Sequence, residues 1–510
     1  MKKLQRGVSK ILTDFIIFLL GLLLIIGVLT TKFSSWLGVP SLVFYILVGM
    51  VLSKFIYYDN AFLTQLFGIF ALIIILFEGG MNTKWSTLKK VIVPSSSLAT
   101  FGVLITAICV GAFAKYILNI SWAEGLLLGA IVSSTDAAAI FATLGSVYVK
   151  RRLSATLEAE SGMNDPMAVI LTLSLITFIQ QPDLSIFNTF LNFIWQIIIG
   201  IFIGLGVGKL TVWCMNKINF DSSGLYPILS LSFAILSYST AALLKGSGFL
   251  AVYIMAVFVG NAQLVYRHSI FRFNEGLAWM MQIFMFILLG LLVFPNELVK
   301  VAWEGIILAI VLIIVARPIS VMISTMNMGF SIREKLFLSW AGLKGAVPIV
   351  LATYPLIANI ENSQLIFNIV FFIVLISALI QGSTISLLAK HLGLLLGEKK
   401  EVAHSLELIS ATKADKEIVE IHIGSKQSHL SKVTISQLPL PKDCLITAII
   451  RDKKIITPKG NARLYENDVV YILIEKGVKA DYFFPKIAGL KFPRRTLLIL
   501  LFFLLEPLFP

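Results

Sequence analysis

The chain has 510 residues, of which 57% are hydrophobic and only 14% charged, and its mean hydropathy is +0.90. A soluble globular protein could not bury so much apolar surface, whereas repeated apolar runs of about 17–25 residues match the hydrocarbon core of a bilayer. The net charge is +14, but the cations lie in short loops between apolar runs, which is typical of membrane topology and not of a nucleic-acid partner.

Thirteen apolar segments follow one another through residues 1–396, and we expect this part to be an all-α polytopic transmembrane domain of about thirteen helices. The boundary between the eighth and ninth segments rests on residues 245–247 alone and stays open. We expect no cleavable leader, because no small-residue cleavage site follows the first apolar run. The segments cover residues 14–30, 36–53, 61–79, 91–118, 122–145, 155–181, 187–215, 224–244, 247–263, 273–294, 301–325, 334–357 and 365–392.

The loops between these segments alternate in their content of lysine and arginine. Loops at 180–183, 296–300 and 359–363 are poor in cations. By the positive-inside rule the rich loops are cytoplasmic, which places the N-terminus outside and the C-terminus inside the cell inner (plasma) membrane. The basic residues within 2–10 contradict this locally, so the helix count near the N-terminus stays open. The rich loops contain Lys84, Lys89, Lys90, Lys150, Arg151, Arg152, Lys209, Lys217, Arg267, Arg272, Arg333 and Lys335.

Carboxylates inside apolar segments are costly, and we expect them to be functional. Glu78 ends the third segment, where an ion-pathway role and a solvated or capping role both stay open. Asp136 lies near the middle of the fifth segment, directly after residues 133–135, whose hydroxyl groups compete for backbone groups and weaken the helix. An interrupted helix at mid-membrane exposes carbonyl groups that suit an ion. A purely structural aspartate is the alternative.

A second polar motif opens the sixth segment. Glu160 and Asn164 share a helix face, while Asp165 is turned about 100° away. Pro166 cannot donate to the carbonyl oxygen of Gly162, which leaves that oxygen free. A carboxylate, an amide, a hydroxyl and a carbonyl group thus lie within one turn, and hard cations favour such oxygen ligands. An interfacial helix cap is the alternative.

Two later segments add a cation and a second helix break. Arg317 in the eleventh segment needs a partner, and we expect Glu160 to form a structural ion pair with it. Gly342, Lys344 and Gly345 in the twelfth segment predict a second interrupted helix. It follows the first by seven segments, so the two run in opposite directions, as in inverted repeats with a site at mid-membrane.

The composition changes after residue 396. Residues 405–487 mix charged residues, turn residues and short alternating apolar stretches, and they predict a small cytoplasmic α/β domain. Residues 491–510 are basic and then apolar, and their role stays open. The three cysteines and five histidines have no ligand-type spacing, so we expect neither a disulfide framework nor a metal centre, and no cofactor.

Five motifs occur in order: LFEGG at 76–80, STDAA at 134–138, ESGMNDP at 160–166, ARP at 316–318 and GLKGAVP at 342–348. Together they resemble the monovalent cation:proton antiporter family 1, most strongly its bacterial potassium/proton antiporters with a C-terminal regulatory domain. The resemblance implies a thirteen-helix fold with a dimerisation part and a mobile ion-carrying core. It also implies a homodimer surrounded by membrane lipid.

The resemblance further implies roles for single residues. Asp165 would bind the cation and the proton in turn, and Glu160 would pair with Arg317. An asparagine–aspartate pair, in place of two aspartates, goes with electroneutral one-for-one exchange in this superfamily. Lys344 stands where relatives often have arginine, so its role stays open. The monovalent cation is expected at Asp165 and Asp136, and the ion site as a whole at Asp165, Asp136, Thr135, Ser161, Asn164 and Glu78.

The C-terminal part contains a second resemblance. Residues 443–452 and 458–460, with Leu464 and Asp468, resemble the TrkA C-terminal (RCK C-terminal) domain of potassium-transport regulators. Asn467 stands where that pattern usually has glycine. The resemblance implies a small regulatory ligand, for example a cyclic dinucleotide, and a merely structural lobe is the alternative.

We therefore predict a secondary active transporter, and not an enzyme, that exchanges cytoplasmic potassium for external protons by alternating access. Competition between a proton and a cation for the buried carboxylate of Asp165 would couple the two fluxes. A sodium/proton antiporter of the same fold is one alternative, because the motifs do not select potassium over sodium. A ligand-gated potassium channel is another. An intramembrane enzyme is remote, because the sequence contains no His-Glu-x-x-His motif.

Overall fold

The structure is a computed structural model of the chain. It describes residues 18, 21–33, 40–53, 60–144, 147–181, 185–292, 295–398, 416–423, 434–438, 444–451, 454–465 and 468–475. The chain divides into two compact units, Met1–Lys399 and Lys400–Pro510, and each is described by itself. The segment 491–510, whose role the sequence left open, lies outside the described residues.

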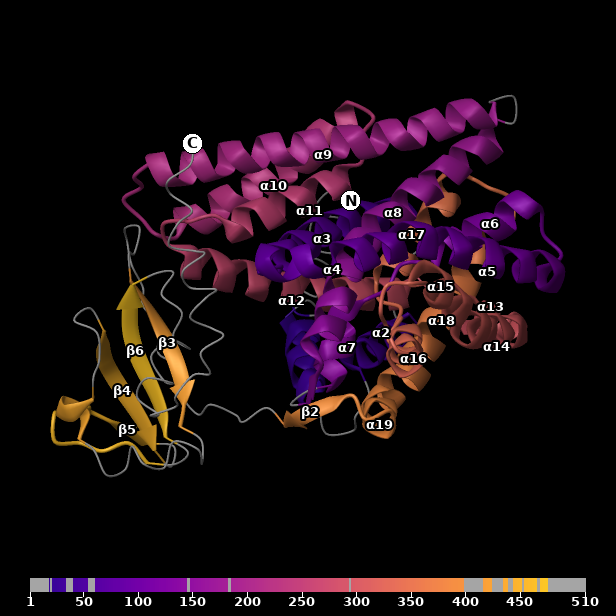
Figure 1. The fold of residues 1–510 in the computed structure, drawn as a ribbon. Coiled ribbons are helices and arrows are strands. Elements are labelled where there is room, and N and C mark those ends of the chain that lie inside the picture. The colour runs from indigo at the N-terminus through magenta and orange to yellow at the C-terminus, as the bar shows by residue number, and fades with distance from the viewer. Residues whose placement is uncertain are drawn as a thin grey trace. The chain divides into compact units, whose positions relative to one another are not determined.

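The first unit is built almost entirely of helices (Figure 1). Within the described residues, eight helices are long and apolar enough to cross a membrane, and five shorter apolar helices accompany them, the first being Gly21–Phe33. The fold class predicted from the sequence is confirmed. The other helices are α2 (Ser41–Leu52), α3 (Ala61–Asn82), α4 (Trp85–Ser97), α5 (Val103–Leu118), α6 (Trp122–Ile131), α7 (Ala137–Leu144), α8 (Arg151–Gln180), α9 (Ile186–Lys217), α10 (Leu225–Leu243), α11 (Gly248–Asn261), α12 (Arg267–Leu291), α13 (Pro295–Lys300), α14 (Ala302–Val311), α15 (Arg317–Ser324), α16 (Ile332–Trp340), α17 (Val347–Ile357), α18 (Ser363–Ser377) and α19 (Ser383–His391).

The boundary that the sequence left open between the eighth and ninth segments is a tight turn between α10 and α11. Lys245 has a φ of 56°, in the left-handed region, and the backbone N–H of Gly246 donates to the carbonyl oxygen of Ala241 over 2.8 Å. This conformation ends α10 and reverses the chain, so two separate helices follow from only three residues.

Two helix starts differ from the sequence-based prediction. α8 begins at Arg151 and not at residue 155, and α12 begins at Arg267 and not at residue 273. The cations assigned to loops therefore lie in the first turns of these helices, where long side chains can reach polar surroundings. As a consequence Asp165 lies in the middle of α8 and not at its opening.

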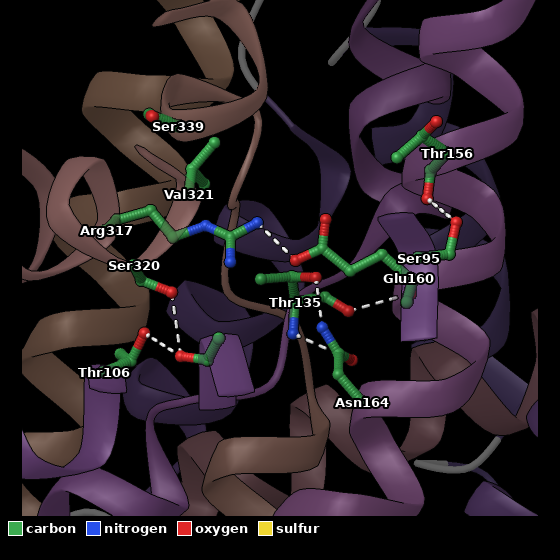
Figure 2. A network of polar contacts seen from close by, with 12 residues as sticks. Ser95, Thr106, Thr135, Thr156, Glu160, Asn164, Arg317, Ser320, Val321 and Ser339 are labelled. Carbon is green, nitrogen blue, oxygen red and sulfur yellow. Dashed lines mark hydrogen bonds and ion pairs between the residues drawn. The ribbon is translucent and has the colours of Figure 1, made fainter. Parts of the chain in front are cut away.

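Three long helices contain a π-helical turn each, at η1 (Leu98–Gly102), η2 (Leu312–Ala316) and η3 (Ala378–Gly382). A π turn releases a carbonyl group from the regular ladder, and such turns are frequent at functional sites. In η1, the carbonyl oxygen of Gly102 accepts hydrogen bonds from the hydroxyl groups of Ser320 (2.8 Å) and Thr106 (2.7 Å) (Figure 2). η2 directly precedes Arg317.

A short antiparallel sheet pairs two strands that are far apart in the sequence. Strand β1 (Val147–Val149) lies between α7 and α8, and strand β2 (Leu395–Glu398) follows α19. The register pairs Val147 with Glu398 and Val149 with Leu395. We refer to these two strands below as the β1–β2 pair.

The described part of the second unit is a four-stranded antiparallel sheet with the order β3-β6-β4-β5. The strands are β3 (Lys416–His422), β4 (Leu445–Arg451), β5 (Lys454–Ile456) and β6 (Val469–Glu475), and a 3-10 turn, η5 (Ile435–Gln437), precedes β4. Among the described residues this unit has no α-helix, so the helical part of the α/β prediction is not seen there. Arg451 donates to both carboxylate oxygens of the fully buried Asp468, each over 2.8 Å, and this pair holds β4 to the turn before β6.

Candidate functional site

Two interrupted helices meet inside the first unit. The first break separates α6 from α7 at residues 132–136, and the second separates α16 from α17 at residues 341–346. The backbone N–H of Asp136 donates to the carbonyl oxygen of Leu343 over 2.8 Å, so the two breaks are joined by a main-chain hydrogen bond. A Cβ atom at Gly345 would overlap the carboxylate of Asp136, which explains why a residue without a side chain occupies this position.

Asp136 also caps the helix that follows it. Its Oδ1 accepts a hydrogen bond from the backbone N–H of Ala139 over 3.0 Å, in the first turn of α7. An aspartate at a helix N-terminus satisfies an otherwise free donor and is stabilised by the helix dipole. One oxygen of Asp136 therefore fixes the start of α7.

Thr135 in the first break is held against α8 by two side chains (Figure 2). The side-chain amide of Asn164 donates to Thr135 Oγ1 over 2.7 Å, and Ser161 Oγ donates to the carbonyl oxygen of Thr135 over 2.8 Å. Asn164 Oδ1 accepts from the backbone N–H of Thr135 over 3.4 Å, and Ser161 Oγ accepts from that of Ala137 over 3.2 Å. Asn164 and Ser161 thus use both their donor and their acceptor to hold the unwound segment.

Asp165 is placed differently from its neighbour Asn164. Its Oδ1 is buried and has no hydrogen-bond partner among the described residues. A buried carboxylate oxygen without a partner is costly, because it has lost water and gained nothing in exchange. Such an atom in a functional membrane protein is a candidate for a bound proton or cation.

Asp165 and Asp136 line one cavity of about 620 Å³. Its walls come from α3, α7, α8, α12 and the second helix break, and Tyr253 of α11 also faces it. The ring of Tyr253 packs so closely on Gly162 that a Cβ atom at that glycine would overlap it. The cavity contains three further carboxylates beside the two aspartates, which are Glu78, Glu158 and Glu275.

Sequence reasoning missed two of these carboxylates. Glu158 lies seven residues before Asp165, which is two turns along the same face of α8, so helical spacing could have revealed it. Glu275 lies in α12, at a position that the predicted boundary placed at the edge of a segment, and no local pattern connects it to α8. Glu78 lies near the end of α3, and its Oε1 accepts a hydrogen bond of 2.5 Å from the side-chain amide of Asn82.

Glu160 and Arg317 form a buried ion pair away from this cavity. Arg317 Nη2 lies 2.5 Å from Glu160 Oε1, and the two side chains are 3% and 0% exposed (Figure 2). Neither residue lines the cavity. A Cβ atom at Gly342 would overlap the guanidinium group, so the second break also leaves room for Arg317. The pair connects α8 to α15.

Lys344 connects the two breaks through its side chain. It is fully buried, and its Nζ donates to the carbonyl oxygens of Ser134 over 2.8 Å and Ser133 over 3.3 Å. These carbonyl groups follow the C-terminal end of α6, where a positive charge is stabilising. The lysine thus supplies the donor that this helix end lacks.

Ser377 and Gln381, which the sequence did not indicate, hold the other side of the break between α16 and α17. Ser377 Oγ accepts from the backbone N–H of Lys344 over 3.0 Å and donates to Gln381 Oε1 over 2.5 Å. The amide of Gln381 then donates to the carbonyl oxygen of Trp340 over 2.8 Å, at the end of α16. Gln381 belongs to the π turn η3, and nothing in the local sequence indicates its partner.

In the described part of the chain, no group of three or more His, Cys, Asp or Glu side chains is arranged to hold a metal ion. The site offers carboxylate, hydroxyl and carbonyl oxygens, which suit a hard monovalent cation as cargo. The assignment of a cation to Asp165 and Asp136 stays a prediction.

Residues 17–391 match the family described as sodium/hydrogen exchanger, transmembrane, and residues 418–478 match the TrkA-C domain. The K(+)/H(+) antiporter NhaP2 of Shewanella sp. (strain ANA-3) is 38% identical over 472 residues, which are 91% of this chain and 82% of that protein. The K(+)/H(+) antiporter NhaP of Alkalimonas amylolytica is 37% identical over 464 residues, which are 90% of this chain and 80% of that protein. The solved structure of the sodium proton antiporter MjNhaP1 from Methanocaldococcus jannaschii at pH 8 has a TM-score of 0.66 and 25% identity, over 73% of this chain and 99% of that chain.

Proposed function

Because the chain belongs to the sodium/hydrogen exchanger family and carries a TrkA-C domain, we propose that it exchanges cytoplasmic potassium for external protons by secondary active transport. The two resemblances predicted from the sequence are confirmed by these matches. Relatives named potassium/proton antiporters align over most of this chain and favour potassium as the cation. The sodium proton antiporter has the same fold at lower identity, and sodium is the second candidate.

One observation carries the mechanism, which is the buried, unpartnered oxygen of Asp165 in a cavity that also contains Asp136. Either a proton or a cation can neutralise that carboxylate, and each excludes the other. If the site faces the two sides of the membrane in turn and crosses only when it is occupied, the two ions exchange. Asp165 is the carrier in this mechanism.

The residues around Asp165 have supporting roles in the proposal. Asp136 uses one oxygen to cap α7, which leaves its other oxygen for the cation. Thr135, Ser161 and Asn164 keep the unwound segment against α8. The contacts of Asn164 favour this holding role over direct cation binding. Because Asn164 adds no charge beside Asp165, we expect electroneutral exchange of one potassium ion for one proton.

The cavity carboxylates favour an inward-facing arrangement. Glu78 and Glu158 lie near the cation-rich ends of α3 and α8, and Glu275 lies near the cation-rich start of α12. By the positive-inside rule these ends are cytoplasmic, so the N-terminus is outside and the second unit is inside. The first unit is an integral membrane domain. We further propose a homodimer in the lipid membrane and a small regulatory ligand for the TrkA-C domain, for which a cyclic dinucleotide is one chemical class.

The carrier assignment is tested by Asp165→Asn in everted membrane vesicles that have been acidified inside by respiration. A dye reports how fast the pH difference collapses when potassium chloride is added. We expect Asp165→Asn to abolish this collapse while the protein still inserts and keeps its melting temperature, because asparagine keeps the shape but cannot exchange a proton. Proton-coupled potassium flux that survives in this variant would contradict the assignment.

The same vesicles separate the alternatives. Sodium chloride in place of potassium chloride tests the choice of cation. A potassium channel would respond to an imposed membrane potential, whereas an electroneutral exchanger would give the same rate at every potential. The relatives are transporters, and the proposal assigns no enzymatic reaction to this chain.

A further inference from the structure

In the β1–β2 pair, the connection between α7 and α8 pairs with β2, the last described strand of the first unit. Strand β1 follows α7, whose first turn is capped by Asp136, and precedes α8, which contains Asp165. Strand β2 follows α19, and the second unit begins two residues beyond it, at Lys400. The pairing is backbone to backbone, with Val149 opposite Leu395.

α7 is a short and direct link between this pair and the ion site. It has eight residues and is therefore about 12 Å long at 1.5 Å per residue. Asp136 caps its N-terminal end and is bonded through its backbone to Leu343 of the second break. A displacement of β1 along or across the axis of α7 would thus reach Asp136 within a few turns of helix.

Residues near the two strands in the sequence are buried. Ile140 and Leu144 of α7 are 1% and 4% exposed, and Val149 of β1 is 6% exposed. Leu394, which immediately precedes β2, is 3% exposed, and Ala389 of α19 is fully buried. α7 packs against α19 and against the π turn η3. The helix that precedes β1 in the sequence is therefore in contact with the helix that precedes β2.

The start of α8 is fixed to other elements directly after β1. Lys150 forms an ion pair of 2.9 Å with Glu334 at the start of α16. Arg152 donates to the carbonyl oxygens of Met328 and Gly329, over 2.5 and 2.9 Å. Because these contacts hold the start of α8, we expect a movement of β1 to displace α7 more than α8.

A two-stranded sheet of three or four residues is at most marginally stable. The free-energy cost of opening a pair of this length is therefore small. An interaction with a small domain is large enough to shift the balance between the paired and the open state. Along the chain, β2 is the described element of the first unit that is nearest to the second unit. A restraint from the second unit would therefore reach β2 first.

We propose that the β1–β2 pair is the joint through which the second unit, with its TrkA-C domain, controls exchange at Asp136 and Asp165. The proposal rests on the proposed exchange function. When the second unit keeps the strands paired, α7 and its cap are fixed in one position, and when it releases β2, α7 and Asp136 gain freedom to move. The second unit thereby changes the exchange rate without contacting the ion.

The test compares four chains in everted vesicles at a fixed pH and potassium concentration: the full chain, the chain ended after Glu398, and each of these with Leu395→Pro. Proline removes an N–H group and fixes φ, which opens a short strand pair. Leu395→Val, which keeps strand character, is the matched control in both backgrounds. We expect the shortened chain to fold, because the solved MjNhaP1 chain corresponds to only part of this one. The match covers 99% of that chain and 73% of this chain.

We expect the full and shortened chains to differ in rate by about fivefold or more, the lower end of typical coupling between sites. In the full chain, Leu395→Pro should give the rate of the shortened chain. In the shortened chain the same substitution should change nothing further. Leu395→Val should follow its parent in each case.

Two results would overturn the proposal. Equal rates in the full and shortened chains would mean that the second unit exerts no control. A loss of rate from Leu395→Pro in both backgrounds would mean that the pair only supports α7. Either result leaves the exchange function standing as long as the unsubstituted chain exchanges ions, whereas no exchange in any chain would refute the function itself.

A second measurement does not depend on transport. Hydrogen exchange of the backbone amides at 147–149 should be slower in the full chain than in the shortened chain, because the second unit keeps the strands paired. Equal protection in the two chains would contradict the proposal even if a proline variant failed to fold.

Discussion

At the scale of single residues, the buried charges of the membrane unit fall into two groups with different surroundings. Glu160 and Arg317 lie outside the cavity and are joined by one contact between Oε1 and Nη2, while Glu160 Oε2 and Arg317 Nε have no hydrogen-bond partner among the described residues. Asp165, five residues further along α8, lines the cavity, and its Oδ1 has no hydrogen-bond partner among the described residues. The first arrangement suits a permanent pair, and the second suits an ion that comes and goes. The first prediction below tests the structural role of the ion pair, and the second concerns Glu275, a further carboxylate of the cavity.

Removal of one partner of the buried ion pair should destabilise the protein more than removal of both. Glu160→Leu leaves a buried guanidinium without a counter-charge, and we expect a loss of about 3–5 kcal/mol in the free energy of unfolding. Glu160→Leu combined with Arg317→Met should recover much of that loss. Melting temperatures in detergent measure the difference, and the exposed pair Glu297–Lys300 provides a control pair. Equal melting temperatures for the single and double variants would contradict the structural role.

The cavity carboxylate of Glu275 should influence how readily the cation enters. We expect Glu275→Gln to raise the potassium concentration for half-maximal exchange by about twofold and to leave the maximal rate unchanged, because a solvated charge attracts a cation only weakly. The effect should shrink as ionic strength is raised with an impermeant salt. Glu297→Gln, outside the cavity, is the matched control. A fall in maximal rate with no change in half-saturation would contradict this role.

At the scale of elements, the two helix breaks act as one unit. A main-chain hydrogen bond joins Asp136 to Leu343, and Lys344 donates from the second break to the carbonyl groups of the first. The side chain of Asp136 has room beside the second break because position 345 is glycine. The breaks depend on this crossing, since neither segment completes its own helical hydrogen bonds.

Gly345→Ala should therefore impair exchange through Asp136. A methyl group there would overlap the Asp136 carboxylate, and we expect the exchange rate to fall by about tenfold or more, as small displacements of functional groups often do. Gly206→Ala on α9, outside the cavity, is the matched control, because the added methyl group would meet no neighbouring atom within 4 Å apart from the backbone of its own helix. An unchanged rate in Gly345→Ala would show that the crossing tolerates a shift of Asp136.

Much of this element-level picture could be predicted from the sequence, because its causes are local. The hydroxyl residues 133–135 weaken α6, and the glycines at 342 and 345 weaken the helix between α16 and α17, so both breaks were expected. The partners Ser377 and Gln381 could not be predicted, because they approach the second break from a different helix. The early start of α8 at Arg151 was missed because charged residues are poor markers of helix ends in membranes.

At the scale of the whole molecule, the first unit is an antiporter domain and the second is a small sheet with a TrkA-C match. The order of cation-rich and cation-poor loops gives the membrane unit its expected orientation. The same order could be derived from sequence alone, because topology depends on the number of charges and not on their contacts. The β1–β2 pair could not, since its strands are about 250 residues apart.

The orientation is tested by labelling single cysteines in a chain whose Cys109, Cys214 and Cys444 have been replaced by serine. Glu361→Cys should react with a membrane-impermeant maleimide on intact cells. Lys84→Cys should react only after the membrane has been opened, because its loop is expected to face the cytoplasm. Both positions are exposed, so accessibility from one side decides the result. Reversed labelling would invert the assignment of the N-terminus.

The bond between Asp136 N–H and the Leu343 carbonyl oxygen has a consequence for protein engineering. This hydrogen bond is made by main-chain atoms. The contact between the two breaks therefore does not depend on the side chains of Glu78, Glu158 or Glu275, which line the cavity from α3, α8 and α12. We expect combined substitutions at these three positions to leave the geometry of the crossing unchanged. A library for redesigned ion preference should vary the cavity wall and leave residues 132–136 and 341–346 as they are.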